Sequence, residues 1–187
     1  MLNLVGQDIT PSSVMKHVMD IQKYFQNDHK ANNWLTECPE IVKPQLPTET
    51  RWKGQLTCIN TFIKNRSSYM NIIHKHKDDF EKQIARKIQD ISIYRSARDL
   101  ATQLCPIAVA LDKAQSDSHS MADLCHMGLY LQQDSLLETH CNVRKKCCRQ
   151  AHTIEHLVAY QLHPCHRSRR MMSVNISSLG TTALWLY

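Results

Sequence analysis

Cysteine and histidine side chains gather near the carboxyl end of this chain. The group comprises Cys141, Cys147, Cys148, His152, His156, His163, Cys165 and His166. His152 and His156 are four positions apart, so on a helix both imidazoles share one face, and two thiolates would complete a tetrahedral zinc site. No Cys-x-x-Cys motif precedes them, however, and the spacing from cysteine to histidine is far shorter than in a zinc finger. We therefore expect incidental thiols and imidazoles here, with no metal ion bound.

Short runs of basic residues occur at three places. They are His74-Lys75-His76-Lys77, Arg144-Lys145-Lys146 with Arg149, and Arg167 with Arg169-Arg170. Lysine and arginine contact nucleic-acid phosphates, but runs this short are also common on the solvated face of an ordinary helix. The run at residues 167–170 would equally serve as a nuclear address. Basic chemistry therefore permits nucleic-acid binding without establishing it.

The tripeptide Thr50-Arg51-Trp52 follows Pro47 and precedes a segment with apolar residues at helical spacing. It resembles the Pro-x-x-Thr-Arg-Trp motif of the hAT superfamily of DNA transposases, the hobo and Activator type. Two flanking segments are similar to that family in the same order. They are Leu2-Asn3-Leu4-Val5 with Asp8-Ile9 near the start, and Leu157-Val158-Ala159-Tyr160-Gln161-Leu162-His163-Pro164 near the end. The span between them covers most of the chain.

The resemblance implies a fold and a role. The chain corresponds to the helical insertion that interrupts the ribonuclease-H-like core of these transposases. The two aspartates and one glutamate with which the family binds its catalytic metal ions fall outside the matching region. We therefore expect no catalytic residue, no cofactor and no enzymatic activity. The expected partner is DNA, a full-length transposase relative is a second expected partner, and the nucleus is the expected location.

The resemblance also implies a nucleic-acid-binding site at Arg51, Trp52 and Lys53. In the family this tryptophan stacks on a flipped-out base beside the cut site, and an aromatic face on an unstacked base contributes roughly 1–3 kcal/mol. Arg51, together with Lys43, Lys53 and Lys64, would contact phosphates. The alternative for Trp52 is packing against Leu56 and Ile59 in the core. The chain departs from the family by having lysine and glycine after the tryptophan, where Asn-Ser is usual, which adds charge but lowers helix stability.

The composition favours a helical protein with a hydrophobic core. The 187 residues are 42% apolar, and only 4 glycines and 6 prolines are present to make turns. No apolar stretch is long enough to cross a bilayer, and the start lacks the pattern of a signal peptide. We therefore expect a soluble intracellular protein with no membrane partner, in which the 8 cysteines are reduced thiols.

Apolar residues recur at helical spacing along most of the chain. We expect one helix from Thr10 to about Trp34, an extended connection with three prolines at residues 36–49, and a helix that begins at Thr50 and breaks at residues 65–68. The remaining helices are expected around residues 69–73, from a cap at Asp78 through Phe80, Ile84, Ile88 and Ile91, from Tyr94 to about Gln115 with a kink or break at Pro106, and over residues 122–133, 136–150 and 153–163.

These segments together predict an all-α bundle of about seven or eight helices. A transposase-like helical domain is expected at residues 1–167 and an irregular tail at residues 168–187. The predicted function is nucleic-acid binding by a transposase-derived fragment without catalysis of its own. Two alternatives stay open: a non-enzymatic protein-interaction module, and the decayed remnant of a mobile element with no selected role.

Overall fold

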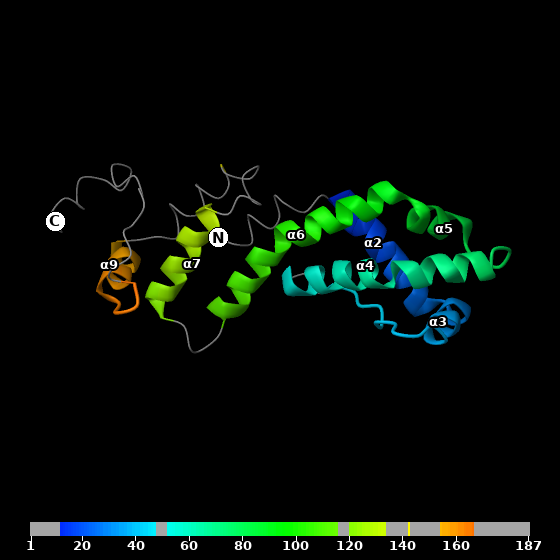
Figure 1. Cartoon of the computed structure of the whole chain (residues 1–187), viewed down its shortest axis with the longest axis horizontal. Helices are drawn as coiled ribbons and strands as arrows, with labels where there is room; N and C mark the ends of the chain where they lie inside the picture. The colour runs from blue at the N-terminus through cyan, green and yellow to red at the C-terminus, as the bar shows by residue number, and fades with distance from the viewer. Residues whose placement is uncertain (1–11, 48–51, 116–119, 134–141, 143–153, 167–187) are drawn as a thin grey trace. The chain divides into compact units, whose positions relative to one another are not determined.

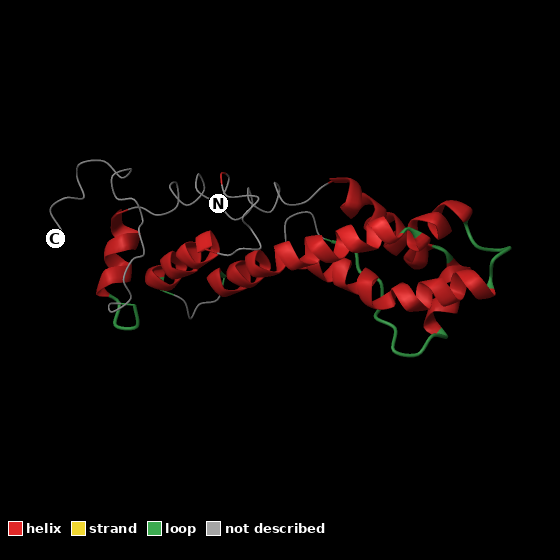
Figure 2. Cartoon of the chain, turned by 45° about the horizontal axis from the view of Figure 1, so that its top comes forward, coloured by secondary structure: helices red, strands yellow, loops and turns green. Residues whose placement is uncertain are grey.

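The computed structural model describes residues 12–47, 52–115, 120–133, 142 and 154–166, and every regular element in these ranges is a helix (Figures 1 and 2). The predicted all-α class is confirmed for this part of the chain. The chain divides into two compact units: an amino-terminal unit, Leu2–Asp112, and a carboxy-terminal unit, Lys113–Tyr187 together with Met1. The predicted helix at residues 136–150, apart from Asn142, and the predicted boundary between residues 167 and 168 lie outside the described residues.

Seven helices are described. They are α2 Ser12–Asn27, α3 His29–Thr36, α4 Trp52–Lys75, α5 Lys82–Gln89 and α6 Ile91–Ala114, which begin in the amino-terminal unit, and α7 Met121–Gln133 and α9 Ile154–Leu162 in the carboxy-terminal unit. The last two match the predicted helices at 122–133 and 153–163 closely, and Pro164 follows α9 as expected.

The first predicted helix is in fact two helices, separated at Asp28. The backbone of Asp28 is extended, with φ −84° and ψ 115°, and its carboxylate accepts a hydrogen bond of 2.8 Å from the Ala31 N–H. This is N-cap geometry, which satisfies a backbone donor at the start of α3. The prediction of one helix to Trp34 was therefore wrong, because Asp28, which interrupts the apolar spacing after Phe25, caps a second helix.

The predicted break at residues 65–68 was also wrong, because α4 is continuous across them. Asn65 does not compete with the helix backbone, as a mid-helix asparagine often does. Its amide instead donates to the Val42 carbonyl at 2.6 Å and accepts from the Val42 N–H at 3.0 Å. The described part of the proline-rich connection, residues 37–47, contains no regular element, as predicted, and Asn65 fixes it to α4.

The segment after α4 differs from its prediction at both ends. Asp78 does not cap a helix: α5 begins at Lys82, and the residue before it makes no side-chain cap bond. The predicted apolar stripe holds for Phe80, Ile84 and Ile88, which are buried, but Ile91 is 48% exposed. Asp90 explains the change, because its extended backbone ends α5 and starts α6 in a new direction.

Helix α6 continues through Pro106, so the predicted break is absent. A proline removes one backbone hydrogen bond and crowds the preceding turn, which weakens a helix without preventing it where packing holds both sides. Leu104 and Ile107, on either side of the proline, are both fully buried. Tertiary packing therefore outweighs the local preference here.

The core of the amino-terminal unit forms around α2 and α4, with α3 and α5 packed on both. Its centre is the stacked pair Phe25 and Tyr69, whose ring centroids are 4.3 Å apart. The other large side chains that are fully buried in this unit include Val18, Ile21, Gln22, Leu35, Ile59, Phe62, Ile88 and Leu104. Within the carboxy-terminal unit, α7 and α9 pack against each other.

Candidate nucleic-acid interface

Trp52, the aromatic residue of the predicted site, is the first residue of α4 and is only 8% exposed. Burial at this level is typical of a packed side chain. Stacking on an unpaired base would first require the indole to be uncovered. The geometry therefore favours the packing interpretation of Trp52 in the conformation described.

The two basic residues of the predicted site differ in what the structure says of them. Arg51 lies outside the described residues. Lys53 is exposed, and its ammonium lies 2.7 Å from a carboxylate oxygen of Asp112 on α6. The side chains of this pair are 67% and 58% exposed, so water screens the interaction strongly. The ion pair therefore holds Lys53 weakly and leaves it able to exchange partners.

A longer polar surface runs along α4 from Lys53. We call it the α4 face and define it as Lys53, Thr57, Asn60, Lys64, Ser67, Asn71 and Lys75. All of these residues are exposed except Thr57, which is partly exposed, and the sequence of α4 contains no aspartate or glutamate. Lysine, serine, threonine and asparagine are the side chains that commonly contact phosphate and sugar groups of DNA.

The α4 face was predicted only in part: Lys53 and Lys64 were expected to contact phosphates, but the helix was expected to break at residues 65–68. Its members recur every three or four residues, a spacing that places them on one side of a helix. The opposite side of α4 carries the buried residues, among them Cys58, Phe62 and Tyr69. The sequence signal was thus present, but it becomes readable only when α4 is known to be continuous.

The basic run at residues 74–77 is only partly available for binding. His74, Lys75 and Lys77 are exposed. His76 instead stacks on Trp34, with ring centroids 4.2 Å apart and planes 8° from parallel. The predicted runs at Arg144–Arg149 and Arg167–Arg170 lie outside the described residues.

Arg66 also belongs to the packing of the unit. Its guanidinium carbon lies 4.5 Å from the centre of the Tyr94 ring on α6, a cation–π contact. Its Nε is buried and has no hydrogen-bond partner among the described residues. Arg66 therefore links α4 to α6 and does not extend the α4 face.

The thiol and imidazole group is described only in part. Cys141, Cys147, Cys148 and His152 lie outside the described residues, and within the part that the structure describes no three potential ligands are arranged to hold a metal ion. The expectation that this group binds no zinc stays a prediction.

His166, a member of that group, instead pairs with Asp123 in the carboxy-terminal unit. Its Nε2 lies 2.9 Å from a carboxylate oxygen of Asp123, and the side chain of His166 is 7% exposed. The rings of His126, Tyr160 and His163 surround it, with centroids at 4.8, 5.0 and 4.9 Å. This cluster joins the first turn of α7 to the residues that follow α9.

The other oxygen of Asp123 completes a helix cap with Ser120. The Ser120 N–H and hydroxyl donate to it at 2.9 and 2.7 Å, and the Asp123 N–H donates back to the Ser120 hydroxyl at 3.2 Å. This reciprocal arrangement is a capping box, and the spacing Ser-x-x-Asp was a sequence signal that the prediction missed. The hydrogen bond with His166, followed by those from Ser120, holds the pKa of the Asp123 carboxyl well below its usual range.

Ser120, Asp123 and His166 do not form a catalytic triad, although they are the residue types of one. In a triad the histidine accepts the proton of the serine hydroxyl and the aspartate orients the histidine. Here the serine hydroxyl donates to the aspartate itself. The arrangement therefore caps a helix and does not activate a nucleophile.

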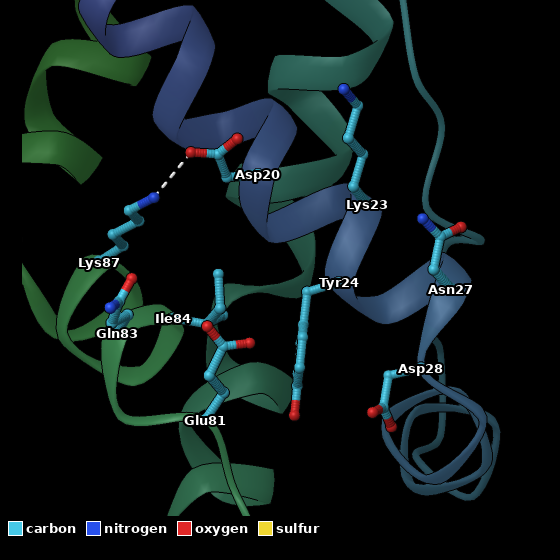
Figure 3. A pocket seen from close by; sticks show the side chains of 9 residues that line it. All are labelled: Asp20, Lys23, Tyr24, Asn27, Asp28, Glu81, Gln83, Ile84 and Lys87. Carbon is cyan, nitrogen blue, oxygen red and sulfur yellow. Dashed lines mark hydrogen bonds and ion pairs between the residues drawn. The ribbon is translucent and has the colours of Figure 1, made fainter.

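An open hollow of about 530 Å³ lies on the amino-terminal unit between α2 and the segment that contains α5 (Figure 3). Three of its five charged side chains have a partner. Lys87 contacts Asp20 at 2.7 Å, and the Asp28 carboxylate caps α3. Partial burial raises the pKa of Tyr24, while a hydrogen bond from the Glu81 backbone lowers it in part. Because the Lys87–Asp20 ion pair and the Asp28 cap already engage these charged groups, the hollow is a weaker candidate site than the α4 face.

Comparisons with protein-family models, with curated proteins and with solved structures find no significant match to this chain. None of the described helices is long and apolar enough to cross a membrane.

Proposed function

We propose that this chain is a DNA-binding module of transposase type that has no catalytic activity of its own and binds through the α4 face. The observation that carries the proposal is the exposed, acid-free side of α4, with lysines at both ends and in the middle. The resemblance of residues 47–52 to the hAT motif supports DNA as the partner, because the last residue of that motif, Trp52, begins this helix. A nuclear site of action is part of the same proposal.

The charge of the chain agrees with this proposal. A net charge of +6 gives long-range attraction to a polyanion. Each lysine that neutralises a phosphate releases a condensed counterion, so the affinity falls as salt rises. The uncharged hydrogen-bonding residues between the lysines would contact phosphate and sugar oxygens at short range.

Fluorescence anisotropy with a labelled duplex, over about 50–200 mM salt, tests the proposal. We expect the protein to bind the duplex. The logarithm of the association constant should fall linearly with the logarithm of the salt concentration. Lys64→Glu should weaken it more than tenfold at low salt, because one contact is lost and a repulsive charge is added. Lys16→Glu is the matched control, since Lys16 is an exposed lysine on α2. Equal effects of the two variants, or no binding at low salt, would contradict the proposal.

The same titration tests the site that the resemblance implies. Arg51→Ala should lower the affinity for all forms of DNA and flatten the salt dependence by about one contact. If the indole is uncovered on binding, Trp52→Ala should lower the affinity for hairpin-tipped or single-stranded DNA more than the affinity for duplex DNA. Because Trp52 is buried, Trp52→Phe serves as a control that keeps an aromatic ring in the core.

The absence of catalysis is tested separately. End-labelled duplex or hairpin DNA, incubated with the purified protein and magnesium or manganese, should stay intact. A two-metal reaction needs carboxylates gathered around ions about 4 Å apart. Cleavage that persists after contaminating nucleases have been removed would show that the non-catalytic part of the proposal is wrong.

Protein interaction is the second candidate function, and the carboxy-terminal unit favours it. Tyr130 on α7 and Leu162 at the end of α9 are 66% and 74% exposed, and Met121 is 48% exposed. Tyrosine and methionine are enriched in surfaces that bind another protein. Tyr130→Ser with Leu162→Ser would reduce such binding and leave DNA affinity unchanged, which distinguishes the two functions.

A further inference from the structure

The three lysines of the α4 face are evenly spaced. Lys53, Lys64 and Lys75 are eleven residues apart in each case, and all three are exposed. Eleven residues make just over three full turns of an α-helix, so the lysines lie close to one line along α4. At 1.5 Å per residue, neighbouring lysines are about 16 Å apart and the outer two about 33 Å apart.

The distance between the outer lysines matches the repeat of B-form DNA. One turn of the duplex is about 34 Å long, or about 10 base pairs. A line parallel to the duplex axis crosses each sugar-phosphate backbone once per turn, so it meets the two strands alternately. A helix laid along that line would bring Lys53 and Lys75 to the same strand one turn apart, with Lys64 near the other strand.

We propose that α4 lies along one full turn of double-stranded DNA and contacts the phosphates of both strands through these three lysines. This inference rests on the proposed function and specifies its substrate as duplex DNA at least one turn long. The grooves differ in width, about 12 Å against about 6 Å, so the central lysine does not meet the second strand at the midpoint. The flexible four-carbon stem of lysine accommodates that offset.

The residues between the lysines agree with a duplex partner. Thr57, Asn60, Ser67 and Asn71 are short, uncharged and able to hydrogen-bond to phosphate oxygens. Single-stranded DNA is bound mainly by exposed aromatic platforms on which bases stack, and none of the seven residues of the α4 face is aromatic. The face therefore has the chemistry for the backbone of a duplex and lacks the chemistry for unpaired bases.

Two duplex lengths test the alignment. A stem of about 7 base pairs, closed by a non-nucleotide linker, is about 24 Å long and reaches two neighbouring lysines, whereas a duplex of about 16 base pairs reaches all three. Wild-type protein should show a salt slope about 0.9 steeper with the long duplex than with the short stem, because the long duplex reaches one more lysine and each phosphate contact adds about 0.9 to the slope.

The variants Lys75→Ala and Lys64→Ala should depend on length in different ways. Lys75→Ala should lower the affinity for the long duplex roughly tenfold at 50 mM salt. It should change the affinity for the short stem by no more than about twofold, because Lys53 and Lys64 remain. Lys64→Ala should lower the affinity for both DNAs. The long duplex loses one of its three contacts, and the short stem cannot reach Lys53 and Lys75 at the same time. Lys16→Ala on α2 is the matched control and should change neither. Circular dichroism should confirm that all three variants keep their helicity.

Each other result has a defined meaning. Equal effects of Lys64→Ala and Lys75→Ala on the short stem, or equal slopes for the two lengths, would overturn the one-turn alignment while leaving DNA binding intact. Displacement of the long duplex by polyglutamate at equal charge concentration would overturn it in favour of general anion binding. If the protein binds neither DNA, the proposed function itself is contradicted, and not only the alignment of α4.

Discussion

The two units of this chain bury polar groups of different chemistry. The amino-terminal unit encloses uncharged ones: the Tyr69 hydroxyl accepts from Asn65 at 3.2 Å and donates to Gln22 at 3.4 Å, and Gln22 in turn donates to the Cys58 carbonyl at 3.2 Å. The carboxy-terminal unit instead encloses an imidazole beside a carboxylate, at His166. The stability of the amino-terminal unit therefore depends on shape and hydrogen bonding, while that of the carboxy-terminal unit also depends on ionisation.

The titration behaviour of the buried groups sharpens this contrast. Burial raises the pKa of Tyr69 to about 12, an effect that the hydrogen bond from Asn65 partly offsets. Burial likewise raises the pKa of the Cys58 thiol to about 12. Neither group ionises between pH 3 and pH 9, so the amino-terminal network should be insensitive to pH there. The low pKa of Asp123 makes the carboxy-terminal cluster sensitive to acid.

The largest effect is expected at Phe25, where shape complementarity decides. Phe25→Ala removes a fully buried ring that stacks on Tyr69, and it should destabilise the amino-terminal unit by about 3–5 kcal/mol. Hydrogen exchange of the α4 amides should accelerate accordingly, since they protect the same core.

Val109→Ala provides the control for this substitution, because Val109 is 48% exposed on α6. It should change stability by no more than about 0.5 kcal/mol. A small effect of Phe25→Ala would show that the amino-terminal unit does not depend on this core, and the contrast between the units would then be lost.

Asn65 tests the uncharged network. Asn65→Ala leaves the N–H and carbonyl of Val42 without their partners and should cost about 1–3 kcal/mol. Asn65→Asp keeps the acceptor for the Val42 N–H but loses the donor, so it should also destabilise the unit. Thermal unfolding followed by circular dichroism measures both. A melting temperature unchanged in Asn65→Ala would mean that water replaces the amide without cost.

These residues also show how far the sequence could predict the structure. The helical class and the helices α7 and α9 were predictable because their apolar residues follow the helical period. Asn65 was read as a helix breaker because its partner, Val42, is 23 positions away and no local pattern identifies it. That error also hid the line of lysines, since their spacing is meaningful only on an unbroken α4.

The pairing of His166 with Asp123 was beyond local reasoning for the same reason. The two residues are 43 positions apart, and only the packing of α9 on α7 brings them together. The capping box at Ser120 was local and could have been found. The candidate site was therefore predictable at the level of residue type around Lys53, but its extent depended on tertiary contacts.

Asp123 tests the ionisable cluster. Its pKa is lower in the folded chain than the unfolded value of about 3.9. The stability that it contributes is therefore fully present above about pH 4 and is lost as pH falls through the folded pKa. Asp123→Ala also removes the cap of α7, so at pH 6.5 it should cost about 1–2 kcal/mol.

Urea unfolding at pH 6.5 and at pH 3 measures this effect. The difference between wild type and Asp123→Ala should be smaller at pH 3, because the wild-type carboxylate has begun to lose its advantage. Asn65→Ala is the control, and its effect should be the same at both values. An Asp123→Ala effect that does not depend on pH would show that the carboxylate acts only as a neutral cap.

The smallest effect is expected at Asp112, which forms the exposed counterpart of the Asp123 pair. The two pairs have similar N–O distances, 2.7 Å for Lys53 with Asp112 and 2.9 Å for His166 with Asp123, but the side chains of the first are 67% and 58% exposed and those of the second 7% and 29%. Because water screens an exposed pair, Asp112→Asn should change stability by less than about 0.5 kcal/mol.

Asp112→Asn should nevertheless raise the affinity for a long duplex about two- to fivefold at low salt, since a repulsive carboxylate beside the α4 face is removed and Lys53 is released. Asp99→Asn, at another exposed acid on α6, is the control for the change in net charge. If both variants raise the affinity equally, the gain comes from overall charge, and Lys53 is no more available to DNA than any other lysine on the surface.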